Sequence, residues 1–224
     1  GLLGCGGAPK PPPKAPGGEA APGGGLAKIL EARAAPQAVI TFAVFGPEAP
    51  PDRPDKAARR LASAVERAFA SPPEGLAQAV KRGGGRPPKL VITPMPVAEL
   101  PLRVEALAQS AGPLAAPLTA ARSVLLLRYK GPAQPDDAHL WATAAAAGVL
   151  AEGDGKVLVD LATYRVTDRA GWQAALARPD FVADQVAVEG EQAAQGVQFV
   201  TRGMAKFALP DLELTGVQRS DARE

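Results

Sequence analysis

The sequence has few of the residues that most enzymes and metalloproteins use for chemistry. It contains one cysteine and one histidine among 224 residues, so no disulfide can form within the chain and a zinc site of nitrogen and sulfur ligands lacks its donors. None of the five serines stands in the Gly-x-Ser-x-Gly elbow of serine hydrolases. We therefore expect no catalytic residue, no cofactor and no metal.

Long hydrophobic runs and a strong charge of one sign are missing as well. No apolar stretch of the sequence approaches the roughly 18 residues that cross a bilayer as a helix. Four of the 25 basic and two of the 23 acidic residues precede residue 36, which leaves 21 of each for residues 36–224. Because proteins that bind nucleic acid concentrate Lys and Arg on one face, this balance argues against such a partner.

The strongest signal that is present lies at the start of the chain. Leu2-Leu3-Gly4 directly before Cys5 resembles the lipobox of bacterial lipoproteins. The resemblance implies that the sequence begins inside a secretory signal and that Cys5 is lipidated, with diacylglycerol on its sulfur and an acyl chain such as palmitate on the new amino terminus. Two or more acyl chains give stable membrane anchoring, at about 0.8 kcal/mol for each buried CH₂. The alternative is a free cysteine in a disordered tail.

The residues after Cys5 predict a tether, and the rest of the chain predicts a folded domain. Nine of the first 25 residues are Gly and six are Pro, a composition that cannot pack a core and behaves as a spacer. Hydrophobic residues make up 46% of the whole chain, although only 4% are aromatic. We expect a tether over residues 1–35 and one α+β domain over 36–224, with two subdomains split near residue 120 as the alternative.

Hydrophobic patterning predicts a mixed, mostly antiparallel sheet with helices packed on one face. Short β-branched runs indicate strands, and apolar residues spaced by four between proline stops indicate helices. Strands are expected at 38–45, 89–93, 123–130, 156–160, 163–166, 181–189, 196–201 and 212–217, and helices at 52–70, 74–81, 135–150 and 171–177. Residues 100–118 fit neither pattern, because three prolines interrupt a weak helical period.

Two motifs in the second half of the chain carry a second resemblance. They are Val157–Trp172 (VLVDLATYRVTDRAGW) and Val200–Leu214 (VTRGMAKFALPDLEL), and they follow His139 and Trp141 on an Ala-rich helix. Together they resemble an uncharacterised bacterial family of myxobacterial type with the signature T-x-G-M-x-K-F-G-L-P-D-L. This sequence has Ala208 where that signature has glycine. The family has no established activity, so the resemblance implies a fold and no function.

The second motif has two interpretations. In the first, Gly203 forms a turn with positive φ, and the apolar side chains that follow it pack into the core; these are Met204, Phe207, Leu209 and Leu212. In the second, Arg202, Lys206 and Asp211 form a binding rim.

The titratable residues near the predicted helix starts and turns also have a structural and a chemical interpretation. We expect His139 to be structural or solvated, and the carboxylates to serve helix starts and a solvated turn; these are Asp136, Asp137, Glu152, Asp154 and Asp160. The segment KRGGGRPPK (Lys81–Lys89) lacks the sequence of a phosphate-binding loop and predicts a basic loop, with a contact to anionic lipid or peptidoglycan as the alternative. Trp141 and Trp172 are expected to anchor the core.

These observations predict a lipid-anchored protein of the cell envelope, on the outer membrane or the periplasmic face. Its folded part is expected to be a non-enzymatic binding or scaffolding domain with a protein or peptidoglycan partner. One alternative is an envelope hydrolase, which requires Asp137, Asp160 and His139 to meet in one pocket with the carboxylates within ~10 Å. Another is a regulatory module for a domain beyond Glu224.

Overall fold

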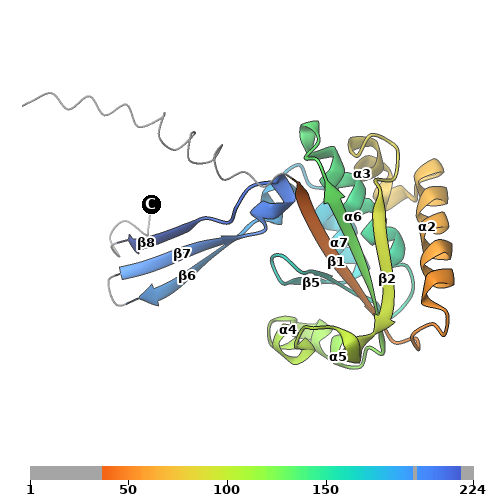
Figure 1. Cartoon of the computed structure of the whole chain (residues 1–224), viewed down its shortest axis with the longest axis horizontal. Helices are drawn as coiled ribbons and strands as arrows, with labels where there is room; N and C mark the ends of the chain where they lie inside the picture. The colour runs from red at the N-terminus through yellow and green to blue at the C-terminus, as the bar shows by residue number, and fades with distance from the viewer. Residues whose placement is uncertain (1–36, 194–195, 218–224) are drawn as a thin grey trace, which may run out of the picture. The chain divides into compact units, whose positions relative to one another are not determined.

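The folded part of the chain has two antiparallel sheets. A computed structural model describes residues 37–193 and 196–217 (Figure 1). A five-stranded sheet has the strand order β2-β3-β1-β4-β5, and a three-stranded sheet has the order β6-β7-β8. The predicted α+β class with antiparallel sheets is confirmed. The predicted lipidation site, Cys5, and the predicted tether lie outside the described residues.

The larger sheet is built around its central strand. β1 pairs with β3 from Ala38 to Gly46 and with β4 from Phe42 to Phe45. Because β3 follows residue 120 and also pairs with β2, segments from both sides of that residue share one sheet. The strands are β1 (Ala38–Gly46), β2 (Leu90–Pro96), β3 (Ser123–Gly131), β4 (Val157–Asp160) and β5 (Arg165–Thr167).

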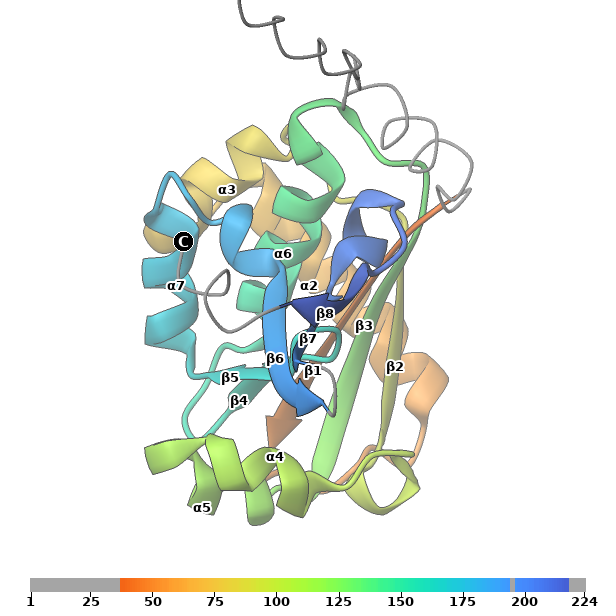
Figure 2. The same ribbon diagram turned by 90° about the vertical axis from the view of Figure 1, so that its left-hand side faces the viewer.

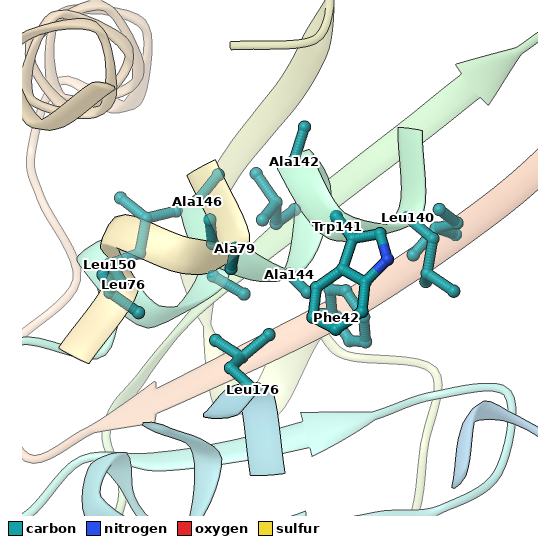
Figure 3. Close-up of a cluster of buried hydrophobic side chains, with 14 of the residues drawn as sticks. Phe42, Leu76, Ala79, Leu140, Trp141, Ala142, Ala144, Ala146, Leu150 and Leu176 are labelled. Carbon is teal, nitrogen blue, oxygen red and sulfur yellow. The ribbon is translucent and has the colours of Figure 1, made fainter. Parts of the chain in front are cut away.

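Four helices cover one face of the larger sheet. They are α2 (Pro54–Ala70), α3 (Ala77–Arg82), α6 (Ala138–Leu150) and α7 (Arg169–Ala177). Alternate side chains of β1, among them Ile40 and Phe42, belong to the core that these helices form. Figure 3 shows Phe42 within this core. Nearly every residue of α6 is buried, which fits a helix that is apolar on all sides. None of the helices in the described residues is long and apolar enough to span a bilayer.

Two short helices lie against the other face, so the expectation of helices on one face only is incomplete. α4 (Val104–Ser110) and α5 (Ala115–Thr119) form from the proline-interrupted segment that the sequence pattern left unassigned. Figure 2 shows α4 and α5 together at one end of the larger sheet. Their apolar side chains pack with the opposite set of β1 residues, Ala43 and Phe45. A second core cluster therefore lies at this end of the sheet.

The helices on the first face pack closely because small residues lie at their contacts. A Cβ added to Gly83, at the end of α3, would lie 2.8 Å from the Cα of Ala142 in α6. Next to it, the guanidinium of Arg82 lies 4.4 Å from the ring centroid of Trp141. Part of the predicted basic loop is thus a packing contact. The predicted core roles of Trp141 and Trp172 are confirmed, since both are buried.

The smaller sheet begins later than the sequence pattern indicates. The sequence pattern predicts a strand from residue 181, but β6 starts at Ala187, because the ring of Phe181 is buried against Trp141, with 4.7 Å between the ring centroids. The strands are β6 (Ala187–Ala193), β7 (Gly196–Arg202) and β8 (Glu213–Val217). Phe199 and Leu214 pair across this sheet and so share a face, on which Leu214 is 59% exposed.

Candidate functional site

Several residues singled out from the sequence meet in a buried polar cluster. A short 3₁₀ helix, Met204–Phe207, carries Lys206, whose side chain is 0% exposed. The Nζ of Lys206 forms an ion pair with the carboxylate of Asp160 and donates to the main-chain oxygen of Gln185 at 2.9 Å and its Oε1 at 3.3 Å. These three acceptors match the three protons of an ammonium group.

Asp160 has its own set of donors. Its Oδ1 accepts from the main-chain N–H of Ala162 at 3.0 Å, and its Oδ2 accepts from the Thr163 hydroxyl at 2.8 Å. Burial lowers the pKa of Lys206, and the neighbouring carboxylate of Asp160 opposes that shift. Both partners of this buried ion pair are therefore fully hydrogen-bonded, as a buried charge requires.

His139 joins the same cluster through the backbone. Its Nδ1 accepts from the main-chain N–H of Gln134 at 3.2 Å, so the proton of the ring lies on Nε2. Nε2 then donates to the main-chain oxygen of Lys206 at 2.8 Å. The ring is buried and lies 5.5 Å from the ring of Tyr129. The predicted structural role of His139 is confirmed.

The other predicted site residues lie outside this cluster. Asp137 is half-buried in front of α6, and no hydrogen bond or ion pair joins it to Asp160 or His139. Arg202 pairs with Glu189 through Nε at 2.6 Å, and the carboxylate of Asp211 accepts from the main-chain N–H of Met204 at 3.1 Å.

The three residues of the predicted binding rim, Arg202, Lys206 and Asp211, do not share one accessible surface. Arg202 and Asp211 are accessible, whereas Lys206 points inward because Asp160 and Gln185 hold its ammonium. The four apolar residues that the sequence places in the core are not fully buried. Met204, Phe207 and Leu209 are half-buried, and Leu212 is exposed. The cluster fixes the 3₁₀ helix to β4 and α6. We assign it a structural role.

A different part of the fold offers an open site. A cleft of about 440 Å³ lies between α2 and the sheet, with Val44, Pro94 and Leu125 contributed by three neighbouring strands. The sheet-facing positions of α2 follow a four-residue spacing, and the last two, Val65 and Phe69, are buried. The first of these positions is Ala57. Because alanine is small, it leaves space between the start of the helix and the sheet. We call this site the α2 cleft.

Charged side chains surround the apolar residues of the α2 cleft. Lys56 and Arg60 come from the first two turns of α2, Arg53 directly precedes the helix, and Lys156 comes from the loop before β4. Two carboxylates, Glu48 and Asp52, come from the segment between β1 and α2. Four positive charges therefore face two negative ones.

The carboxylates of the cleft do not form direct ion pairs with its three cations at the start of α2. Arg53, Lys56 and Arg60 form no ion pair with any residue in the described ranges 37–193 and 196–217. Lys156 donates to the main-chain oxygen of Leu150 at 3.3 Å. Prolines at 47, 50, 51 and 54 restrict the backbone that carries the rim. The site is therefore largely preformed.

The sequence pattern did not identify the α2 cleft. Its basic residues belong to a predicted amphipathic helix, where such side chains are usually solvated, and its floor comes from strands predicted only as buried. The one available signal is the spacing of Arg53, Lys56 and Arg60 along one side of a helix. In the part of the chain that the structure describes, no group of three or more His, Cys, Asp or Glu side chains could hold a metal ion.

Comparisons with protein-family models, curated proteins and solved structures give no match to this chain. The resemblance of residues 137–214 to the uncharacterised myxobacterial-type family stays a prediction. The α2 cleft and the buried cluster are therefore interpreted from their own geometry.

Proposed function

We propose that this chain is a lipid-anchored protein of the cell envelope whose folded part is a non-enzymatic binding domain with the α2 cleft as its site. The observation that carries the proposal is a set of cations around an apolar floor, three of which, Arg53, Lys56 and Arg60, form no ion pair with another described residue. The volume of the cleft, about 440 Å³, lies within the range of about 300–1,000 Å³ that small-molecule sites occupy. Such sites combine an apolar lining with a few convergent charged groups.

The buried cluster is a weaker candidate for chemistry, and so is the envelope hydrolase that would use it. Both nitrogens of His139 and both carboxylate oxygens of Asp160 already have partners inside the protein. A substrate would have to displace these bonds and enter a region where both side chains are at most 2% exposed. We therefore favour binding over hydrolysis, with a small molecule, a protein segment or a peptidoglycan fragment as the partner.

Fragment mapping tests the assignment of the binding site. Amide spectra of the ¹⁵N-labelled full chain are recorded with a library of small cationic, neutral and anionic fragments. We expect the shifts from binding fragments to gather at the non-proline residues of 44–61, 123–125 and 156, which surround the α2 cleft. An absence of shifts there for fragments of every charge would contradict the proposal.

The lipid anchor is tested separately, on protein isolated from its native membrane. The support for the anchor is the Leu-Leu-Gly-Cys sequence before a Gly/Pro-rich segment. Intact mass spectrometry is expected to show a chain that begins at Cys5 and carries a diacylglyceryl group, with a further acyl chain on its amino group. A chain that retains Gly1–Gly4 and a free thiol would refute the anchor and leave the binding site untouched.

A further inference from the structure

We infer that the α2 cleft takes an anionic amphiphile, a molecule with a carboxylate, phosphate or sulfate head and an apolar tail. The inference rests on the proposed binding function and specifies the chemistry of the ligand. Two features of the cleft carry it: the arrangement of the cations along α2 and the composition of the floor.

The cations define where the head binds. Lys56 and Arg60 occupy positions i and i+4 of α2, so they are neighbours on one side of its first two turns, and Arg53 directly precedes the helix. Three neighbouring positive charges repel one another when no carboxylate pairs with them. A bound anion removes this repulsion, and Arg and Lys donate charge-assisted hydrogen bonds to its oxygens. The N-terminal end of the 17-residue helix adds a favourable dipole.

The floor defines what the rest of the ligand is. Val44, Leu61, Pro94 and Leu125 present carbon to the cleft, and the hydroxyl of Ser123 is the only uncharged polar side chain among its lining residues. A sugar or a nucleobase buried here would leave most of its hydrogen-bonding groups without partners, which is costly. A hydrocarbon tail needs no such partners. The floor therefore favours an apolar tail.

The two carboxylates give the site its polarity. Glu48 and Asp52 lie on the segment between β1 and α2, whereas Lys56 and Arg60 lie on the helix itself and Arg53 directly precedes it. An anionic head is repelled by the first group and attracted by the second, so it binds on the helix side. Removing either negative charge should therefore strengthen anion binding.

Calorimetric titration of the full chain with octyl phosphate, below its micelle concentration and at low salt, tests the inference. 1-Octanol has the tail without the charge, inorganic phosphate has the charge without the tail, and octyltrimethylammonium reverses the charge. We expect octyl phosphate to bind at least about tenfold more tightly than each of the three. We also expect added salt to weaken its binding, because salt screens exposed charges.

Matched substitutions locate the binding. Lys56→Ala and Arg60→Ala should each raise the Kd for octyl phosphate about three- to tenfold, while Glu48→Gln should lower it. Arg67→Ala is the control, because Arg67 lies on the same helix two turns further on, is exposed and does not line the cleft. The control should leave the Kd unchanged.

Vesicles distinguish a membrane lipid from a soluble anion as the source of the ligand. Vesicles of phosphatidylglycerol in phosphatidylcholine should compete with octyl phosphate if the natural ligand is a bilayer lipid, and should not compete if it is soluble. In both cases the ligand has an anionic head and an apolar tail.

Equal Kd values for octyl phosphate and 1-octanol, or an Arg67→Ala effect as large as that of Arg60→Ala, would overturn the inference. The proposed binding function survives that result if neutral or cationic fragments still map to the cleft, and fails with it if none do.

Discussion

At the scale of single residues, the side chain that departs most from its usual environment is Lys206. Lysine is rarely fully buried, yet here its ammonium lies in the core with Asp160 and Gln185 as acceptors. Its position depends on Gly203, which has φ 102° and whose added Cβ would lie 2.4 Å from the main-chain oxygen of Gln185. Glycine at this point lets the 3₁₀ helix approach closely enough for Lys206 to reach the cluster.

We expect Lys206→Met to lower the free energy of unfolding by about 3–5 kcal/mol, because it leaves the carboxylate of Asp160 buried without its cation. The double variant Asp160→Asn, Lys206→Met should lose less than the sum of the two single variants, since it leaves no unpaired charge. Urea denaturation of the four proteins measures this coupling. Additive losses would show that the pair is not coupled in the way the structure indicates.

Ala208 lies in a backbone conformation that glycine prefers. Its φ is 57°, in the left-handed region. The T-x-G-M-x-K-F-G-L-P-D-L signature, which this segment resembles, has glycine at the same position. Ala208→Gly should therefore raise the free energy of unfolding by about 0.5–1 kcal/mol, because relief of strain exceeds the entropy that glycine adds to the unfolded chain. Ala62→Gly, in the interior of α2, is the control and should lower it by about 1 kcal/mol. A loss of stability at position 208 would contradict the strain.

At the scale of helices and strands, periodicity predicted most of the fold. β1, α2, β3 and α6 begin and end within a few residues of the predicted bounds, because each has a strong apolar pattern and a proline or glycine at one end. The failures have tertiary causes. α4 and α5 are short helices whose positions depend on packing against Phe45. Prolines at 101, 113 and 117 interrupt the apolar pattern of this segment, so local patterning does not reveal the helices.

The contact between α3 and α6 gives a prediction at this scale. Gly83→Ala should destabilise the fold by about 1–3 kcal/mol, because the new methyl group would meet the backbone of Ala142, which cannot move aside. Gly148→Ala is the matched comparison: the atoms nearest to its methyl group belong to the side chains of Leu76 and Trp172 and not to a backbone, and alanine favours a helix. Thermal unfolding should show the larger fall in Tm for Gly83→Ala. The reverse order would argue against this close helix contact.

At the scale of the whole molecule, the candidate site depends on properties that no local pattern contains. Residues 36–224 carry 21 basic and 21 acidic side chains, so their net charge gives no sign of a cleft with four cations and two carboxylates. The space itself depends on the distance between α2 and the sheet, where a small side chain, Ala57, meets the floor. The sequence could predict the helix, the strands and the structural role of His139, but not their separation.

The assignment of binding to the α2 cleft is the central claim, and filling the cleft tests it most directly. Ala57→Trp places an indole among the lining residues, whereas Ala70→Trp places it at the exposed end of the same helix. The measurement is fragment mapping on both variants, with Tm as the check on folding. We predict that Ala57→Trp abolishes the shifts around the cleft without lowering Tm and that Ala70→Trp retains them. Undiminished shifts from the same fragments in a folded Ala57→Trp protein would contradict the account.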